Sequence, residues 1–123
     1  MRKFALVLLS GALALTTPAA QGHSALVTST PKSGAVIKTF PKSFSLTFNE
    51  EILKLPGKEP SRVQLIAPGA KRISLGKVVI AKEVLTVPMS KAVVKAGKYR
   101  LTYRVVSNDG HVINGEISFT YKP

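Results

Sequence analysis

The chain has 123 residues, with 18 lysines and arginines against 6 aspartates and glutamates, and it contains no cysteine. This length suits a single domain, and the lack of cysteine excludes both a disulfide framework and a thiolate metal site. The positive charges are scattered rather than gathered in one run, so we expect a solvated basic surface and no nucleic-acid partner.

The first 22 residues have the three parts of a secretory signal peptide. Arg2 and Lys3 supply the positive charge, residues 4–15 form an apolar stretch that is too short to span a bilayer, and small residues follow it. We therefore expect 1–22 to be a signal peptide and 23–123 to be one exported domain, in the periplasm or another extracytoplasmic space. A retained N-terminal anchor is the less favoured interpretation.

The cleavage position decides which residue begins the exported domain. Ala20 and Gly22 fit the small-x-small pattern, and cleavage after Gly22 makes His23 the first residue. Removal of 22 of the 123 residues, with two of the 18 cationic side chains, leaves 101 residues with a formal net charge of +10. A chain of this length can bury a sufficient core without disulfides. Cleavage after Ala20 is the alternative, and it would leave Gln21 first.

The exported part has the pattern of short β-strands separated by turns that contain proline or glycine. Residues 23–30 form an extended lead-in, and 31–34 form a turn. Residues 35–37 are a short apolar segment, and alternating or short apolar segments predict β structure over residues 44–49, 62–66, 73–75, 77–80, 84–87, 98–106 and 116–122. Proline and glycine at 56–60 require a loop, and 107–115 form the loop before the last strand.

Residues 98–106 give the strongest strand pattern, because one face carries only apolar or aromatic side chains, namely Tyr99, Leu101, Tyr103 and Val105. No segment has the apolar spacing of an amphipathic helix. About seven short strands with frequent turns are typical of an all-β fold. We therefore expect a single-domain antiparallel sandwich or Greek-key β-barrel.

The two histidines of the chain, His23 and His111, are the candidate metal ligands. As the first residue, His23 would offer its α-amino nitrogen and its Nδ1 to one ion in a six-membered chelate ring. The α-amino pKa is about 7.7–8.0, low enough for a metal to displace the proton at neutral pH. One imidazole nitrogen of His111 and an oxygen of Asp109 complete an N₃O set, which suits tetragonal Cu(II). We therefore expect one Cu(II) per chain.

Each of these residues also has a simpler interpretation. Residues 108–110, Asn-Asp-Gly, are an ordinary turn sequence, and a lone surface histidine usually binds nothing. Glu50 and Glu51 could add a carboxylate to the site, but their spacing alone favours a charge pair at a strand end. Met89 is better explained as core filler than as a Cu(I) ligand.

Catalytic alternatives have little support in the sequence. Ser107, Asp109 and His111 lie two residues apart on one turn, and this spacing cannot give the relayed geometry of a catalytic triad. The chain has no cysteine nucleophile and no glycine-rich phosphate-binding loop. We therefore predict that the protein is not an enzyme.

Four segments that cover nearly the whole exported domain carry a family resemblance. They read HSALV-x-S-x-P at 23–31, FSLTFNE at 44–50, AGKYRLTYRVVSNDGH at 96–111 and GEISFTY at 115–121. With these segments the chain resembles the CopC/PcoC-type periplasmic copper-binding proteins and their YobA-like relatives. The third segment, with its Asp-Gly-His end, is the most specific of the four.

This resemblance implies a cupredoxin-like or immunoglobulin-like β-barrel that binds Cu(II). By motif position the ligands are His23, Asp109 and His111, with Glu50 as a candidate additional ligand. Family members that also bind Cu(I) carry a methionine-rich loop, whereas Met89 stands alone here, which favours Cu(II) only. The resemblance also implies a monomer in copper resistance or homeostasis, with an inner-membrane copper transporter of the CopD type as a candidate partner.

Three functions fit these observations to different degrees. The one we favour is an exported carrier or buffer of Cu(II) for resistance or uptake. The second is a copper oxidase that uses the same N-terminal histidine, as polysaccharide monooxygenases do. Such enzymes need a flat, often aromatic substrate face, and this chain has three tyrosines and no tryptophan. The third is a metal-free immunoglobulin-like adhesion or binding module whose basic face contacts a partner.

Overall fold

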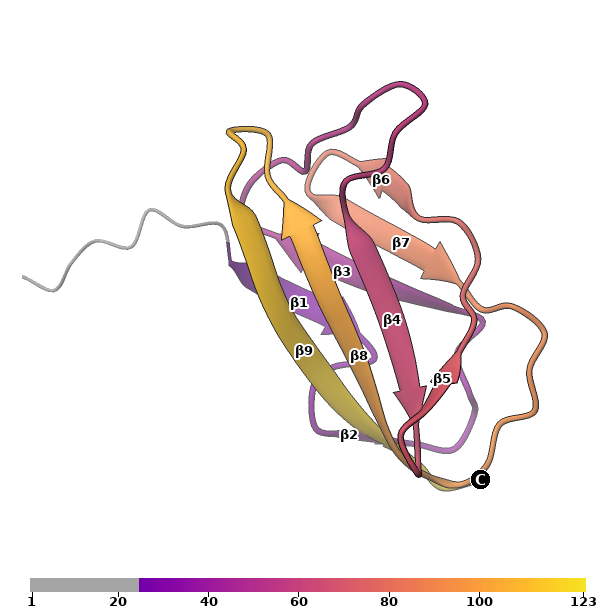
Figure 1. Ribbon diagram of the computed structural model, residues 1–123. Helices are drawn as coiled ribbons and strands as arrows, with labels where there is room; N and C mark the ends of the chain where they lie inside the picture. Colours follow the sequence, from indigo (N-terminus) through magenta and orange to yellow (C-terminus); the bar gives the residue numbers. More distant parts are fainter. Residues whose placement is uncertain (1–24) are drawn as a thin grey trace, which may run out of the picture.

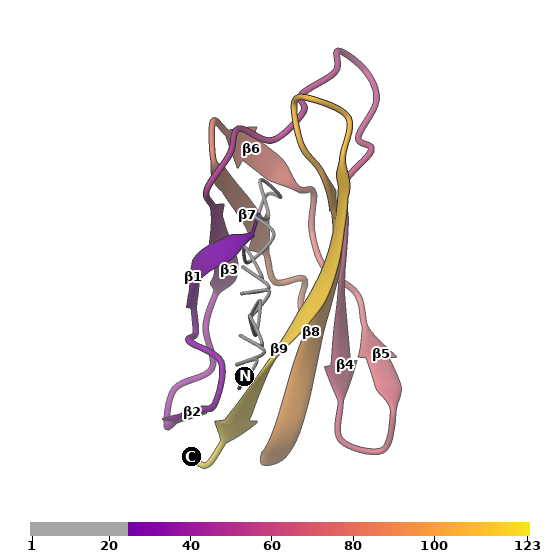
Figure 2. The same ribbon diagram turned by 90° about the vertical axis from the view of Figure 1, so that its left-hand side faces the viewer.

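The computed structural model describes residues 25–123. Nine strands make up this part of the chain: β1 (Leu26–Thr30), β2 (Ala35–Ile37), β3 (Ser43–Phe48), β4 (Arg62–Ala67), β5 (Lys71–Ile73), β6 (Val79–Ala81), β7 (Val84–Pro88), β8 (Gly97–Val106) and β9 (Val112–Tyr121). They form two sheets that face each other (Figures 1 and 2). None of the described residues forms a helix that is long and apolar enough to cross a membrane.

The sheets confirm the predicted all-β sandwich. One sheet has the strand order β1-β3-β7-β6 and the other has the order β2-β9-β8-β4-β5. All neighbouring strands are antiparallel except β2, which runs parallel to β9. The strand count exceeds the expected value of about seven because the extended lead-in and the short apolar segment 35–37 also pair as sheet strands, β1 and β2.

The core lies between the sheets and follows the alternation in the sequence. Phe44, Leu46 and Phe48 of β3 are fully or almost fully buried, as are Tyr99 and Leu101 of β8. Every second residue of a strand points to the same face, so this pattern places one face of each sheet against the other. Tyr103 is half-buried, and its ring meets Phe48 edge-on at a centroid distance of 5.6 Å.

The last strand begins earlier than the sequence indicated. β9 starts at Val112, so the preceding loop covers residues 107–111 instead of 107–115. Asn114 and Gly115 are turn-forming residue types, but Gly115 lies inside the strand opposite Tyr103. A Cβ atom at position 115 would overlap the Tyr103 ring, so packing explains the glycine at this position.

The β8–β9 hairpin is the longest pairing in the described chain, and it positions the loop of interest. Its register runs from Gly97 opposite Tyr121 to Val106 opposite Val112. Residues 107–111 therefore form the tip of a ladder that is fully paired along its length. The tip lies at one end of the sandwich, next to the connection between β3 and β4 (Figure 1).

Candidate metal centre

The hairpin tip is closed by its own backbone. The Ser107 amide donates to the His111 carbonyl at 2.8 Å, and the Gly110 amide donates to the Ser107 carbonyl at 2.9 Å. Gly110 has a φ of +90°, a conformation that side chains with a Cβ rarely adopt, so glycine fits this position. The closed turn brings Asp109 and His111 to the same side of the loop.

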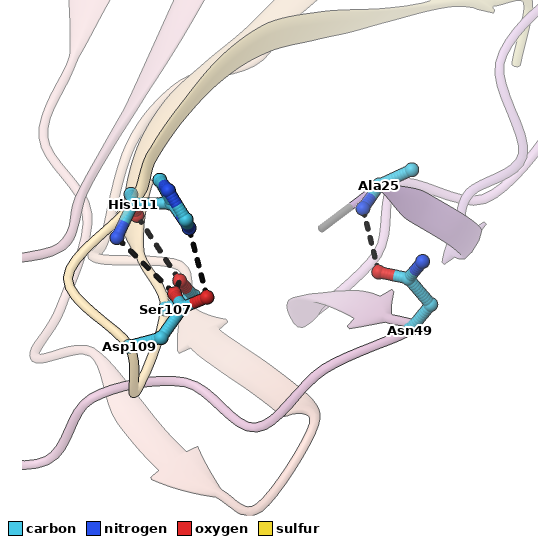
Figure 3. Close-up of polar contacts among 5 residues, drawn as sticks. All are labelled: Ala25, Asn49, Ser107, Asp109 and His111. Carbon is cyan, nitrogen blue, oxygen red and sulfur yellow. Dashed lines mark hydrogen bonds and ion pairs between the residues drawn. The ribbon is translucent and has the colours of Figure 1, made fainter. Parts of the chain in front are cut away.

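Asp109 and His111 form a direct pair. The Nδ1 atom of His111 lies 2.8 Å from Oδ2 of Asp109, and the His111 amide donates to Oδ1 at 3.3 Å. Oδ1 also accepts a short hydrogen bond from the hydroxyl of Ser107, a residue that is only 1% exposed (Figure 3). Ser107 thus anchors the carboxylate from the interior, and the carboxylate in turn orients the imidazole.

These hydrogen bonds keep Asp109 ionised. They lower the pKa of the Asp109 carboxyl to about 2, and the Ser107 hydroxyl has the largest effect, followed by the side chain and the backbone amide of His111. The side chains of His111 and Asp109 are nevertheless 58% and 49% exposed. The pair therefore offers a permanent negative charge and an imidazole to an ion that arrives from solvent.

A second segment, residues 49–53, is bound to the hairpin through its backbone. The Asn108 amide donates to the Glu51 carbonyl at 2.9 Å, and the Leu53 amide donates to the Val106 carbonyl at 2.9 Å. Ile52 forms an isolated antiparallel bridge with Ser107. Glu50 is half-buried in this segment, so the segment brings its carboxylate to the same end of the molecule as the hairpin tip.

Ala25, the first described residue of the chain, is also hydrogen-bonded to this segment. The Ala25 amide donates to Oδ1 of Asn49 at 2.6 Å, and the Asn49 amide donates to the Ala25 carbonyl at 3.0 Å (Figure 3). Residues 49–53 therefore connect the start of β1 to the hairpin tip. His23, the predicted chelating residue, lies outside the described residues.

The structure thus brings together two of the four predicted site residues, Asp109 and His111. Within residues 25–123, no three His, Asp or Glu side chains gather closely enough to hold a metal ion, so Glu50 does not form such a group with the pair. The structural roles of Ser107 and Asn49 were not predicted from the sequence. Ser107 precedes Asp109 by two residues, a local signal for its hydrogen bond, whereas the pairing of Asn49 with Ala25 depends on the sheet register.

Comparisons with known proteins agree with this fold. A family model described as the CopC domain matches residues 26–122. Copper resistance protein C of Xanthomonas campestris pv. juglandis is 30% identical over 132 residues, covering 98% of this chain and 97% of that protein. The crystal structure of CopC from Methylosinus trichosporium OB3b superposes with a TM-score of 0.67 at 26% identity, covering 82% of this chain and 95% of that one.

A further solved structure supports the fold alone. It is PcoC, a methionine-rich copper resistance protein from Escherichia coli, which is 24% identical to this chain. The superposition has a TM-score of 0.65 and covers 81% of this chain and 99% of that one. The two sheets found here are therefore shared across nearly the full length of that protein.

Proposed function

The chain belongs to the CopC family, and on this premise we propose that it is an exported protein that binds one Cu(II) ion and carries or buffers it in copper resistance or homeostasis. The proposed ligands are the amine and imidazole of His23, together with Asp109 and His111. The observation that carries the proposal is the hydrogen-bonded Asp109–His111 pair, which sits on a hairpin tip joined to the segment that holds Ala25.

The position of Ala25 supports the participation of His23. His23 precedes Ala25 by two residues, and two residues of extended chain span at most about 7 Å. Ala25 is bound to Asn49, and Glu51 in the same segment accepts a hydrogen bond from Asn108 at the hairpin tip. We therefore propose that the first residue of a domain cleaved after Gly22 starts beside the segment that is bound to the hairpin tip.

The chemistry of this donor set favours Cu(II). Two nitrogens of His23, one imidazole nitrogen of His111 and one oxygen of Asp109 suit a tetragonal ion, and Cu(II) leads the affinity order for nitrogen sites. Asp109 is already ionised and needs to lose no proton to bind a metal. In the metal-free pair the Asp109 carboxylate contacts Nδ1 of His111, and Nε2 points away from it, so coordination of both side chains to one ion requires this contact to open.

The scarcity of sulfur ligands in the sequence supports Cu(II) as the oxidation state of the bound copper. Met89 is one of two methionines in the sequence, the other being Met1. It forms an isolated bridge with Leu75 and packs against the core, so it acts as a core side chain. Cu(I) prefers thioether and thiolate ligands, so we infer a site for Cu(II) only. Glu50 remains a candidate additional ligand because its segment is bound to the hairpin.

A carrier must give up its ion as well as bind it. The exposure of the His111 and Asp109 side chains allows an acceptor to approach the ion directly. We propose that the protein acts as a monomer in the periplasm or an equivalent space, with residues 1–22 removed on export. A CopD-type copper transporter in the inner membrane is the proposed acceptor.

A titration of the exported, processed protein with Cu(II) tests this function. We expect saturation at one ion per chain, a type 2 Cu(II) electron paramagnetic resonance spectrum with nitrogen hyperfine structure, and an increase in the melting temperature, because the ion binds only the folded state. The absence of saturable binding, together with an unchanged melting temperature, would refute the proposal and favour the metal-free binding module.

A further inference from the structure

Acidic side chains gather at one end of the sandwich. Five of the six acidic residues lie on the loops around the hairpin tip, namely Glu50, Glu51, Glu59, Glu83 and Asp109. Backbone and side-chain hydrogen bonds tie these loops together: the Ile52 amide donates to Lys82, and the Val106 amide donates to the Ser61 hydroxyl. The sixth, Glu116, forms an ion pair with Arg100 at 3.1 Å. The acidic residues are thus concentrated at the end of the sandwich that carries the candidate metal centre, which we call the acidic end, although Lys54, Lys58 and Lys82 lie on the same loops.

The charged side chains at the opposite end are all positive. It is built from residues 37–42, 67–72, 88–98 and 119–123, none of which is acidic. We call this region the cationic end; its exposed charged residues are Lys38, Lys42, Lys71, Arg72, Lys91, Lys95, Lys98 and Lys122. Half of the 16 cationic side chains after residue 22 are thus on this end of the molecule.

An exposed apolar side chain lies among these charges. Val93 is 90% exposed, the highest value among the large exposed hydrophobic side chains of the described chain. It lies in the loop between β7 and β8, with Lys91 and Lys95 on either side. The Tyr99 hydroxyl donates to the Lys95 carbonyl at 2.6 Å and accepts from the Lys95 amide at 3.0 Å. The buried Tyr99 therefore anchors the loop that presents Val93 to solvent.

A surface pocket opens beside this loop. Its volume is about 490 Å³, and its lining includes the cations Lys71, Arg72, Lys91 and Lys95 as well as Ala67, Ile73, Val93 and Tyr99. Positive charges thus surround an apolar floor. A partner that fits this surface must present negative charge and apolar groups close together, as the headgroup and upper acyl region of an anionic phospholipid do.

We propose that the cationic end docks on a bilayer that contains anionic phospholipids, with Val93 at the boundary between headgroups and acyl chains. Seven of the eight cations are lysines, which act as hydrated point charges and suit a diffuse anionic surface. A groove for an acidic protein segment would favour arginines that bind carboxylates with two hydrogen bonds.

This orientation has a consequence for the metal centre. The ten residues of β8 connect the cationic end to the hairpin tip, and a strand of that length spans about 30 Å. Docking would therefore turn Asp109 and His111 away from the bilayer, so the docked protein would take up the ion from the surrounding space and would have to leave this position before it meets an acceptor in the membrane. The proposal concerns a surface remote from the copper ligands, so it can fail while copper binding holds, and the reverse is also true.

Vesicle binding tests the proposal with the exported, processed protein in metal-free form. We expect cosedimentation with vesicles of equimolar phosphatidylglycerol and phosphatidylcholine, weaker binding as salt increases, and no binding to phosphatidylcholine alone. Replacement of Lys91 and Lys95 by serine should weaken binding by about fivefold per lysine. The matched control replaces Lys58 and Lys77, which lie near the acidic end, and should leave binding nearly unchanged.

A second pair of variants tests the apolar contact. Val93→Ser should weaken vesicle binding even at high salt, whereas Val79→Ser, which alters another exposed valine, should not. If both double-lysine variants lost the same fraction of vesicle binding, the effect would come from net charge alone, and the proposal would be overturned. Tighter binding to soluble polyglutamate than to the anionic vesicles at the same salt would also overturn it, in favour of an acidic protein segment.

Discussion

The imidazole of His111 is held by Asp109, whose own carboxylate is anchored to the interior by Ser107. The Nδ1–Oδ2 distance is 2.8 Å, and the Ser107 side chain reaches the same carboxylate from a buried position. This chain of contacts orients an exposed histidine before any ion arrives.

The replacement Ser107→Ala should raise the pKa of Asp109 from about 2 toward its ordinary value of 3.8, because the Ser107 hydroxyl is the largest single cause of the shift. The carboxyl carbon resonance of Asp109, followed by NMR in the metal-free protein as the pH is lowered, measures this change. Ser74→Ala removes an exposed hydroxyl elsewhere and serves as the control. An unchanged midpoint in the Ser107 variant would contradict the role assigned to the hydroxyl.

The lowered pKa of Asp109 also predicts a pH-dependent contribution to folding. A carboxyl whose pKa is lower in the folded state stabilises that state above its ordinary pKa of 3.8, and this contribution is lost as the pH falls toward about 2. Asp109→Asn should therefore reduce the urea midpoint near neutral pH, and this effect should shrink steadily as the pH falls from 3.8 toward about 2. A difference that is the same at both pH values would show that the carboxylate charge is not its cause.

Copper binding should depend most strongly on His111. Loss of a group that only orients a ligand reduces metal affinity about 10–100-fold. His111→Ala removes a proposed ligand, so its loss of Cu(II) affinity should exceed this range. The loss of Cu(II) affinity in Asp109→Asn should at least reach this range. Competition with a chelator of known affinity measures both. Binding should weaken toward acid pH, because the imidazoles and the α-amine must lose protons to bind the ion. Equal affinity of wild type and His111→Ala would exclude this residue as a ligand.

Gly115 should be needed for the packing of the hairpin. Gly115→Ala places a methyl group in the space of the Tyr103 ring, and we expect a loss of about 1–3 kcal/mol in the free energy of unfolding. Urea denaturation measures it. The same change in a Tyr103→Ala background should have little effect, because the ring is absent. A similar loss in both backgrounds would place the cause in the backbone and not in this contact.

The strands could be predicted because the alternation of apolar and polar residues that marks a strand lies within a short stretch of the sequence. Alternation in residues 44–48 and 99–105 identified the core faces of β3 and β8, and the buried fractions confirm both. The start of β9 was not predictable in this way, since Gly115 looks like a turn residue until Tyr103 is known to lie opposite. The register of two strands depends on contacts between segments that are distant in the sequence, so local patterns in a single sequence do not determine it.

In the candidate site, too, local contacts could be predicted from the sequence and contacts between distant segments could not. Asp109 and His111 are two residues apart on one turn, so their proximity could be inferred from spacing. The link from Ala25 through Asn49 to the hairpin joins residues that are 24 and more positions apart, and only the folded sheets reveal it. The part played by His23 depends on where the signal peptide is cut, and it stays a prediction.

The most direct test of the copper proposal is the Cu(II) affinity of a protein that carries one extra alanine before His23. The extension keeps both imidazoles and Asp109 but converts the α-amine of His23 into an amide, so the chelate ring cannot form. Mass spectrometry of the N-terminus defines both proteins, and circular dichroism confirms that both are folded. We predict that the affinity falls at least tenfold and that the nitrogen hyperfine pattern changes. The same affinity and the same spectrum in both proteins would contradict the N-terminal chelate.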